Sequence, residues 1–463
     1  MHPTSDERLR PFPRFWDEPR ETLALAPRRE LILERVQAQL RDVYERNPFY
    51  RRLYDAHGVR PDQIRSLDDF TARVPIVTKQ MIRDDQAAHP PFGSYSTTEP
   101  HDVARVFGSS GTTGTPTLYA ISKGDWARAA EAQAMAVWGM GVRPGDVVQL
   151  AFPFSMFIGG WALLLGVEGI GATAFSVGAL DSRRQVELIG LTRSTVLMAT
   201  PSYVMHLAEV ARNLGVDLRR SSIHTLIVGG EPGGGVPGSK EAMKAAWGAH
   251  VTICDTGNTS ECFPTQMNSS CHHGTGMHVY EDEVYLEIVS PDDLNRGVVD
   301  GEFGATVYTT LWRQSQPMIR FAAGDRARLS REPCACGRTY PRLPEGLVCR
   351  LDDTLLIRGV NVYPSAIEAT LRQIDGVGSE YRVFVEKHGA MDDLRIEVEV
   401  DRPWLNAQGD DAAAARAHLV KKLADELRHD LGIRVDVQLV DAGTFEQMVF
   451  KARRVIDKRT PAT

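Results

Sequence analysis

The sequence predicts an α/β protein, with a large N-terminal domain of doubly wound sheets and a small C-terminal α+β domain. Apolar runs at 195–200 and 225–230 predict buried strands, and the stretch 201–214 between them predicts a helix. This alternation is typical of a doubly wound sheet, in which ligands bind at the carboxyl ends of the strands. The chain has 463 residues, 43% of them hydrophobic, which is enough for more than one core.

Other elements of the large domain follow from the same periodicities. Residues 29–46 predict an amphipathic helix, and 127–140 predict a helix rich in Ala and Met. The alternating pattern over 278–289 predicts one strand, and 301–310 predict another. The uncharged run 147–167 is long enough to cross a bilayer. However, Pro and Gly interrupt it, so we expect a buried strand, a turn and a helix, and no contact with a membrane.

The C-terminal part predicts a second α/β pattern. Strands are expected at 381–387, 394–400 and 435–440, with a helix at about 411–430. A short helix is expected to start at Ser365, with Ser365 as its N-cap and Glu368 completing a capping box.

Composition excludes several classes of function. The net charge is −7 and the isoelectric point is near 6.0, which argues against a general nucleic-acid binder. Residues 1–8 contain no apolar run, so we expect no secretory signal there. Six cysteines in a chain of this length do not suggest a disulfide framework. A reducing, cytoplasmic location is therefore expected, and the sequence leaves a homodimer open.

One stretch is unusually rich in glycines and hydroxyl side chains: Phe107-Gly108-Ser109-Ser110-Gly111-Thr112-Thr113-Gly114-Thr115-Pro116-Thr117. It begins at the last residue of a predicted strand at 103–107. Glycines let the backbone approach a ligand, and consecutive N–H groups with hydroxyls form a concave site for anions. The motif lacks the Gly-Lys-Ser/Thr ending of a Walker A loop, because Thr115 stands where a lysine would be expected. Taken alone, a phosphate site and a polar surface loop are equally good readings.

Cysteine and histidine gather in two clusters, Cys271-His272-His273-Gly274-Thr275-Gly276-Met277-His278 and Cys334-Ala335-Cys336. Two clusters far apart in sequence can supply two ligands each to a tetrahedral zinc ion. Spacing alone leaves the choice among His272, His273 and His278 open. Four protein ligands would make the zinc structural, and the alternative is four ordinary reduced thiols and imidazoles.

Several motifs together resemble one family. The run Ser-Ser-Gly-Thr-Thr-Gly-x-Pro-Thr at Ser109–Thr117 is similar to the phosphate loop of adenylate-forming enzymes, the acyl-CoA synthetase superfamily, and most similar to its phenylacetate–CoA ligase branch. Val74–Lys79 and the helix region near Asn47 also resemble that branch. The resemblance extends from about residue 29 to Arg459, with the motifs in the family's order.

The resemblance implies an ATP site. By it, Ser109, Ser110, Gly111, Thr112, Thr113 and Gly114 hold phosphates, and Gly230, Glu231 and Pro232 lie against the adenine. Asp255, Thr256 and Ser260 belong to a further nucleotide-binding segment, in which Glu261 binds Mg²⁺. Asp325 binds the ribose hydroxyls and Arg350 contacts the nucleotide. By the same resemblance, Cys271, His278, Cys334 and Cys336 are the zinc ligands.

The resemblance also implies two domains that move against each other. Asp352 matches the family's hinge residue, so the expected domains are 1–350, with the ATP, acyl and zinc sites, and 351–463, which is mobile. Lys451 matches the lysine that contacts the acyl carboxylate and the α-phosphate. The sequence departs from the family at Gly257-Asn258, which replace Tyr-Gly, and at Phe450, where Gly is usual.

These parts imply a two-step reaction. The acid is first joined to AMP with release of pyrophosphate, with Glu261, Arg350 and Lys451 as the catalytic residues, and coenzyme A then takes the acyl group. The acyl pocket is expected to be aromatic and apolar, formed by Phe152, Phe154, Phe157, Trp161 and Gly257. This predicts an aromatic or arylalkyl acid as substrate. An alternative keeps adenylation but loads a carrier protein or an amine.

Overall fold

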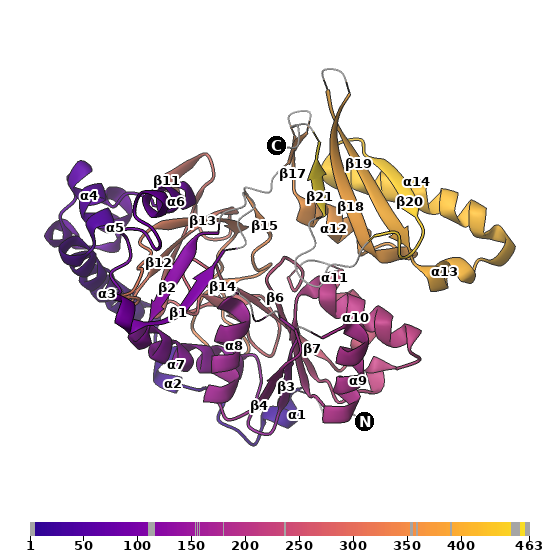
Figure 1. Cartoon of the computed structure of the whole chain (residues 1–463), viewed down its shortest axis with the longest axis horizontal. Helices are drawn as coiled ribbons and strands as arrows, with labels where there is room; N and C mark the ends of the chain where they lie inside the picture. The colour runs from indigo at the N-terminus through magenta and orange to yellow at the C-terminus, as the bar shows by residue number, and fades with distance from the viewer. Residues whose placement is uncertain are drawn as a thin grey trace.

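The computed structural model describes residues 5–109, 116–152, 154, 156, 158–178, 180–235, 238–351, 355–357, 360–388, 391–445 and 454–458. Its largest sheet has eight strands in the order β14-β9-β8-β7-β6-β5-β3-β4 (Figure 1). Neighbours from β4 to β7 are parallel and those from β7 to β14 are antiparallel. The strands are β3 (Val147–Leu150), β4 (Thr173–Ser176), β5 (Val196–Ala199), β6 (Thr225–Gly229), β7 (Thr252–Gly257), β8 (Asn268–Ser270), β9 (Met277–Val279) and β14 (Arg342–Leu343).

Helices cover both faces of this sheet, because alternate residues of its central strands point to opposite sides. On β5, Val196 and Met198 pack with α7 (Lys123–Gly139) and α8 (Ile158–Gly169). Leu197 and Ala199 of the same strand pack with α9 (Ser182–Thr192), α10 (Pro201–Asn213) and α11 (Ser239–Trp247). Full burial on both faces explains why these strands are continuous apolar runs in the sequence.

A second sheet of five antiparallel strands, ordered β11-β10-β12-β13-β15, packs with the N-terminal helices. Its strands are β10 (Val284–Ser290), β11 (Asp293–Gly297), β12 (Gly304–Thr310), β13 (Phe321–Ala327) and β15 (Cys349–Arg350). The helices are α1 (Ser5–Leu9), α2 (Glu18–Glu21), α3 (Leu25–Arg46), α4 (Pro48–Ala56), α5 (Leu67–Arg73) and α6 (Lys79–Ala88). A hairpin of β1 (Val103–Gly108) and β2 (Leu118–Ser122) joins the same core. Short 3₁₀ turns occur at Pro61–Gln63, Pro100–Asp102, Leu218–Arg220 and Gly409–Asp411.

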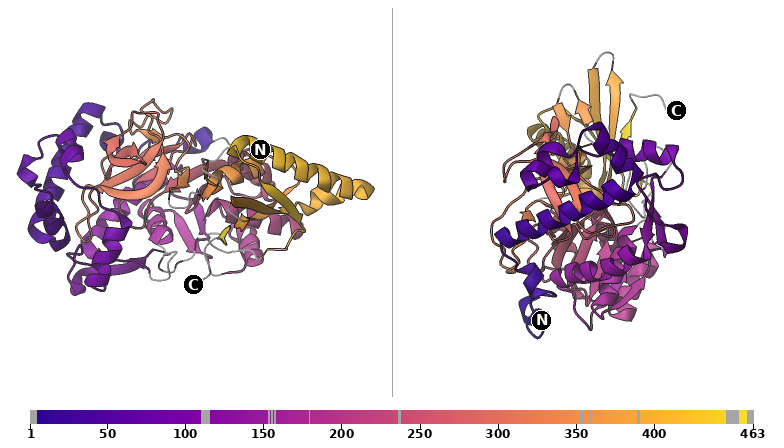
Figure 2. Two further views of the ribbon diagram at one scale, coloured as in Figure 1. Left: turned by 90° about the horizontal axis from the view of Figure 1, so that it is seen from above. Right: turned by 90° about the vertical axis from the view of Figure 1, so that its left-hand side faces the viewer.

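The C-terminal lobe has a core of its own, built on the sheet β20-β19-β18-β21. Its elements are β16 (Leu355–Ile357), β17 (Val360–Val362), α12 (Pro364–Leu371), β18 (Val377–His388), β19 (Met391–Val400), α13 (Arg402–Asn406), α14 (Ala412–Leu431), β20 (Asp436–Val440) and β21 (Val455–Asp457). Figure 2 shows α14 (yellow) at the opposite end of the molecule from α3 to α6 (indigo to violet). The predicted fold class, a large doubly wound N-terminal domain with a small C-terminal α+β domain, is confirmed.

Two local predictions need correction. The stretch 278–289 is not one strand, because a turn at Tyr280–Glu283 carries the chain from β9 in the large sheet to β10 in the other sheet. Ser365 is not an N-cap, because α12 begins at Pro364 and Tyr363 occupies the cap position without a side-chain hydrogen bond. Glu368 instead pairs with Arg372 and Arg454.

The uncharged run 147–167 forms β3 and the start of α8, as predicted. In the described part of the chain, no helix is long and apolar enough to span a bilayer.

Candidate active site

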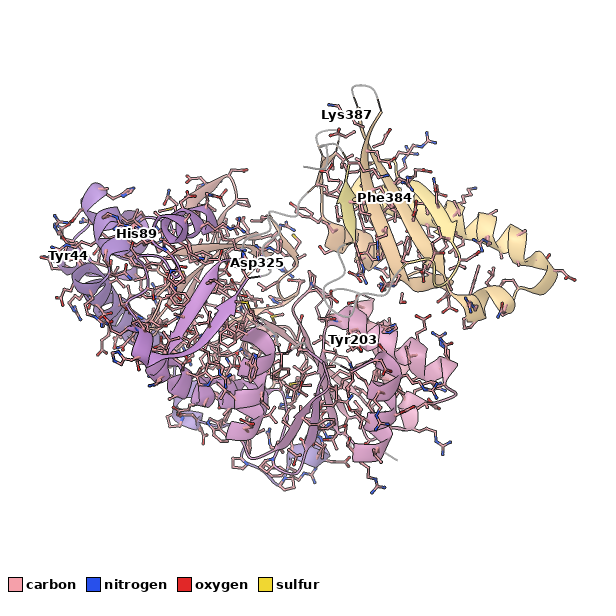
Figure 3. All side chains as sticks on the ribbon, in the orientation of Figure 1. Tyr44, His89, Tyr203, Asp325, Phe384 and Lys387 are labelled. Atoms are coloured by element: carbon pink, nitrogen blue, oxygen red, sulfur yellow. The ribbon has the colours of Figure 1, made fainter. Side chains whose placement is uncertain are left out.

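A cleft with a cavity of about 210 Å³ lies beyond the carboxyl ends of β6 and β7. Charged side chains at its wall come from both sheets and from α6, namely Lys79, Glu231, Asp255, Glu261, Asp325 and Arg350. Figure 3 labels one of them, Asp325, at the centre of the molecule. A parallel sheet ends at this edge, which is where α/β proteins bind their ligands.

Ser109 stands at the entrance to the glycine-rich loop and lines the cleft. Its backbone N–H donates to the carbonyl of Thr117 at 2.9 Å, and its Oγ accepts from the backbone N–H of Thr117 at 3.3 Å. These two bonds hold the ends of the loop together. Ser110, Gly111, Thr112, Thr113, Gly114 and Thr115 lie outside the described residues.

The segment after β6 turns sharply into the cleft. Gly230 has a φ of +87°, a conformation that favours glycine, and a Cβ on Gly229 would stand 2.5 Å from the carbonyl oxygen of Thr256. The carboxylate of Glu231 accepts a hydrogen bond from the backbone N–H of Ser202 at 2.7 Å, at the start of α10. Burial raises the pKa of Glu231, while Arg454 of the C-terminal lobe favours its charged form. Pro232 follows in the same wall.

Asp255, at the end of β7, is a buried carboxyl with an unusual proton affinity. Burial raises its pKa to about 7, although Lys240 and backbone N–H groups of Thr256 and Gly235 stabilise the charged form. Gly234 makes room for it, since a Cβ there would stand 2.5 Å from the Asp255 carboxyl carbon. Asp255 and Thr256 both line the cleft, as does Ser260 farther along the loop.

Glu261 is buried at 4% exposure, and it is held in its ionised form. Burial opposes ionisation, but Lys79 and a hydrogen bond from Thr259 lower its pKa below the ordinary value. The Lys79 Nζ lies 3.6 Å from Glu261 Oε1. A buried carboxylate with a single lysine beside it can still accept a divalent cation. Sequence reasoning noticed Lys79 within the Val74–Lys79 motif but did not place it in the site.

Asp325 and Arg350 face each other from adjacent strands. They are register partners on β13 and β15, and Arg350 Nη1 lies 3.8 Å from Asp325 Oδ1. Arg350 also donates to the carbonyl of Ala323 at 3.3 Å. Asp325 is 9% exposed and lines the cleft.

The lining of the cleft also has apolar side chains, and these include Phe152, Leu163, Phe263, Met277 and Leu347. Gly257 lines it too, and a Cβ there would stand 2.8 Å from Leu347 Cδ1. Leu347 therefore fills the space beside Gly257 that a larger side chain would need.

Of the aromatic residues predicted for the acyl pocket, some line the cleft and others do not. Phe152 lines the cleft, whereas Phe154 and Trp161 stack edge to face with ring centroids 5.0 Å apart. Arg105 lies 4.4 Å from the Trp161 ring. Neither ring is among the described residues lining this cavity. Phe157, the hinge candidate Asp352 and the catalytic candidate Lys451 lie outside the described residues.

Four buried side chains converge away from the cleft: Cys271, His278, Cys334 and Cys336. Their ligand atoms all lie within 4.8 Å of one another, with Cys271 and Cys334 Sγ atoms 3.7 Å apart. Sγ atoms at zinc–sulfur bond length in a tetrahedron would be about 3.8 Å apart. His278 Nδ1 is 3.3 Å from the carbonyl of Tyr340, which leaves Nε2 facing Cys336. His272 and His273 group with Asp6 instead.

Comparisons with known proteins agree with this arrangement. Residues 33–284 match the family model "AMP-binding enzyme", and 359–459 match "AMP-binding enzyme C-terminal domain". The chain is 35% identical to the phenylacetate-coenzyme A ligase of Thermus thermophilus, over 95% of this chain and 98% of that protein. It is 31% identical to the Escherichia coli protein of the same name, over 96% and 97%.

Solved structures of one enzyme, 2-hydroxyisobutyryl-CoA ligase, separate two conformations. In its postadenylation state with R3-HIB-AMP, that enzyme is 39% identical and superimposes with a TM-score of 0.90, covering 96% of this chain and 93% of that one. In its thioesterification state with 2-HIB-AMP and CoA, the TM-score is 0.72, with coverage of 99% and 94%. The chain therefore superimposes better on the postadenylation structure of that enzyme than on its thioesterification structure. The chain belongs to the AMP-binding enzyme family, as a phenylacetate-coenzyme A ligase-like member of the adenylate-forming superfamily and an AMP-forming acid–coenzyme A ligase.

Proposed function

We propose that this enzyme activates an aromatic or arylalkyl carboxylic acid of the phenylacetate type. The observation that carries the proposal is one cleft in which Glu231, Glu261, Asp325 and Arg350 meet an apolar lining. The charged part suits a nucleotide, and the apolar part suits the side chain of an acid. The names of the relatives agree with this division, since each acts on a carboxylic acid and coenzyme A.

In the first step the acid carboxylate attacks the α-phosphorus of ATP, the bond to the β-phosphate breaks, and pyrophosphate leaves. We assign Asp325 to the ribose hydroxyls, because a carboxylate can accept both hydrogen bonds. Arg350, which faces Asp325, lies where it can favour negative charge on the transferring phosphate. We assign to the adenine the part of the cleft wall formed by Gly230, Glu231, Pro232, Asp255 and Thr256.

Glu261 is the proposed ligand of Mg²⁺. Its lowered pKa keeps the carboxylate charged at neutral pH, as a ligand for a hard cation must be. When bound, the ion would offset negative charge on the phosphates. Lys79 Nζ, 3.6 Å from the same carboxylate, supplies a positive charge in the wall of the cleft. The residues proposed to bind the phosphates of ATP are Ser109, Ser110, Gly111, Thr112, Thr113, Gly114 and Ser260.

A structural zinc ion is the proposed occupant of the cluster Cys271, His278, Cys334 and Cys336. Three thiolates and one imidazole are a usual zinc set, and the ligand spacing fits a tetrahedron. Cys271 directly follows β8, and His278 lies on β9 next to the cleft residue Met277. Zinc would therefore hold two strands that wall the substrate site, without taking part in the chemistry.

Lys451 is proposed to contact the acid carboxylate and α-phosphate during adenylation, from a C-terminal domain that starts at residue 351 and turns about Asp352. Residues on either side of this boundary support it, since Leu351 packs with the N-terminal part and Leu355 with the C-terminal core. Two conformations of a 39% identical ligase are consistent with such rotation. In the second step the coenzyme A thiol attacks the acyl carbonyl and AMP leaves.

We propose a cytoplasmic enzyme, because the six cysteines, all of them described, form no disulfide bond. Transfer to a carrier protein or an amine finds no support among the relatives described above.

A screen for pyrophosphate release tests the proposal. Purified enzyme with ATP and Mg²⁺ is offered phenylacetate, substituted benzoates and indole acetate, with and without coenzyme A. We expect pyrophosphate release that depends on an aromatic acid, and AMP and acyl-CoA as products only when coenzyme A is present. Lys451→Ala should abolish the formation of all three products. An enzyme that releases pyrophosphate with short aliphatic acids alone would overturn the aromatic assignment.

A further inference from the structure

Three side chains that could bind a metal ion meet outside the cleft. They are Asp6 on α1 and the consecutive histidines His272 and His273, and each offers one ligand atom within 4.8 Å of the other two. None of the three lines the cleft, and none belongs to the cluster of three cysteines and His278. Neither the reaction nor the proposed structural zinc therefore accounts for this group.

The loop that follows α7 holds the first of the two histidines. The backbone N–H of His272 donates to the carbonyl of Gly139 at 2.9 Å, and a Cβ on Gly141 would stand 3.1 Å from the His272 Cβ. The side chain of His272 is 12% exposed, and its ring centroid lies 4.2 Å from that of His273. One imidazole is thus mostly buried, and the other stands beside it at the surface.

Helix α1 is anchored to the large domain on both sides of Asp6. Ser5 Oγ lies 3.0 Å from Thr252 Oγ1, which is on β7. Arg8 Nη1 donates to the carbonyl of Gly141 at 2.8 Å, in the same loop that holds His272. These contacts keep the carboxylate of Asp6 next to the two rings.

The spacing of the ligand atoms suits a late divalent transition metal. Asp6 Oδ1 lies 3.9 Å from His272 Nε2. Two ligand atoms at about 2.1 Å from a tetrahedral zinc ion are about 3.4 Å apart. A small rotation of the Asp6 carboxylate, which is 76% exposed, would give that distance. Imidazole nitrogen favours Zn²⁺, Ni²⁺ or Cu²⁺, whereas Mg²⁺ and Ca²⁺ prefer oxygen ligands alone.

We propose that Asp6, His272 and His273 form an exchangeable Zn²⁺ site that joins α1 to the loop after β8. This site is independent of the acid that the enzyme activates. Three protein ligands leave one tetrahedral position for water, in contrast to the four buried ligands of the cysteine cluster. Zinc at this site therefore exchanges readily with the solution, and its occupancy sets how firmly the N-terminal helix is held.

Zinc titration of the full-length enzyme, free of any histidine tag, tests this inference. The protein is dialysed against a mild chelator, its remaining zinc is measured, and binding of added Zn²⁺ is followed by calorimetry. We expect the wild type to bind one equivalent more than His273→Ala, whatever the occupancy of the cysteine cluster. Equal uptake by the two proteins would overturn the inference.

Two further variants locate the ion. Asp6→Asn changes an exposed side chain and should weaken binding of this equivalent about 10–100-fold, a loss typical even of residues that only support a metal ligand. The control is His429→Ala, at an exposed position of α14, which should bind zinc as the wild type does. Undiminished affinity in Asp6→Asn, or loss of the same equivalent in His429→Ala, would overturn the assignment.

Hydrogen exchange tests the connection to α1. Added Zn²⁺ should slow amide exchange in residues 5–9 of the wild type and leave it unchanged in His273→Ala. Zinc binding without slower exchange in α1 would overturn the role of Asp6. Failure of the proposed function looks different, since then no aromatic acid causes release of pyrophosphate, whereas failure of this inference leaves that release intact.

Discussion

Contacts within the N-terminal lobe differ in kind from the described contacts between the lobes. Within it, ion pairs between residues far apart in sequence are buried, as when Arg338 pairs with Glu21 and Arg320 binds Glu287 at 2.8 Å. Between the lobes, Glu209 accepts from Ser379 at 2.9 Å and Arg212 pairs with Asp401 at 3.3 Å. These are polar contacts of partly exposed groups, which cost little to break. The two ion pairs within the N-terminal lobe are thus buried, whereas these two contacts between the lobes are partly exposed.

This difference predicts that substitutions in the cleft have the largest effects. Glu261→Gln should lower the rate of pyrophosphate release about 10²–10³-fold, because Mg²⁺ would lose its proposed carboxylate ligand and the phosphates would lose the positive charge that the ion supplies. Pre-steady-state release of pyrophosphate measures this step. Glu302→Gln, at an exposed position, is the control and should match the wild type. Near-normal adenylation by Glu261→Gln would remove this carboxylate from the site.

The next effect concerns the stability of the N-terminal lobe. Cys336→Ser should lower the free energy of unfolding by about 3 kcal/mol or more if zinc is lost. Metal analysis and thermal melting measure both quantities. Cys262→Ser is the matched control, since Cys262 is buried but lies outside the four-ligand cluster. Purified protein without stoichiometric zinc, together with unchanged melting of Cys336→Ser, would contradict the structural metal.

A smaller effect depends on pH. The pKa of Asp255 is raised to about 7 in the folded protein, so its stabilising contribution is present at low pH and is lost as the pH rises through 7. The Asp255→Asn variant has no carboxyl at this position to ionise, so it does not lose this stability as the pH rises. Its stability relative to the wild type should therefore grow by about 2–3 kcal/mol between pH 5 and pH 8, at 1.36 kcal/mol per pKa unit. Denaturant unfolding at both pH values measures the change, and a constant difference would contradict the raised pKa.

The smallest effect is expected between the lobes. Arg212→Ala breaks an ion pair whose arginine is about half exposed, and it should change the free energy of unfolding by less than about 1 kcal/mol. Any change in turnover should appear in thioester formation rather than in adenylation, as single-turnover assays of the two steps can show. Arg183→Ala removes an exposed pair within α9 and serves as the control. A large loss of stability in Arg212→Ala would mean that the lobes are firmly joined.

Most of the fold was predictable because its signals are local. The strands at 196–199 and 225–229 are buried on both faces and appear in the sequence as apolar runs. The buried face of α14 appears as the spacing of Leu419, Leu423 and Leu427. The prediction for 278–289 was wrong because alternation continues through a turn, and only sheet pairing reveals that the chain changes sheets there. Ser365 had the right residue type for a cap, but Pro364 already begins the helix.

By itself, the sequence determined the order of the motifs and the residues at the strand ends, because each motif lies within a few consecutive residues. Tertiary structure alone decided which distant groups meet. It brought His278, rather than His272 or His273, to the three cysteines. It also placed Lys79 beside Glu261 and set Leu347 against Gly257. Such meetings depend on how sheets and helices pack over long sequence separations, and no local pattern encodes that packing.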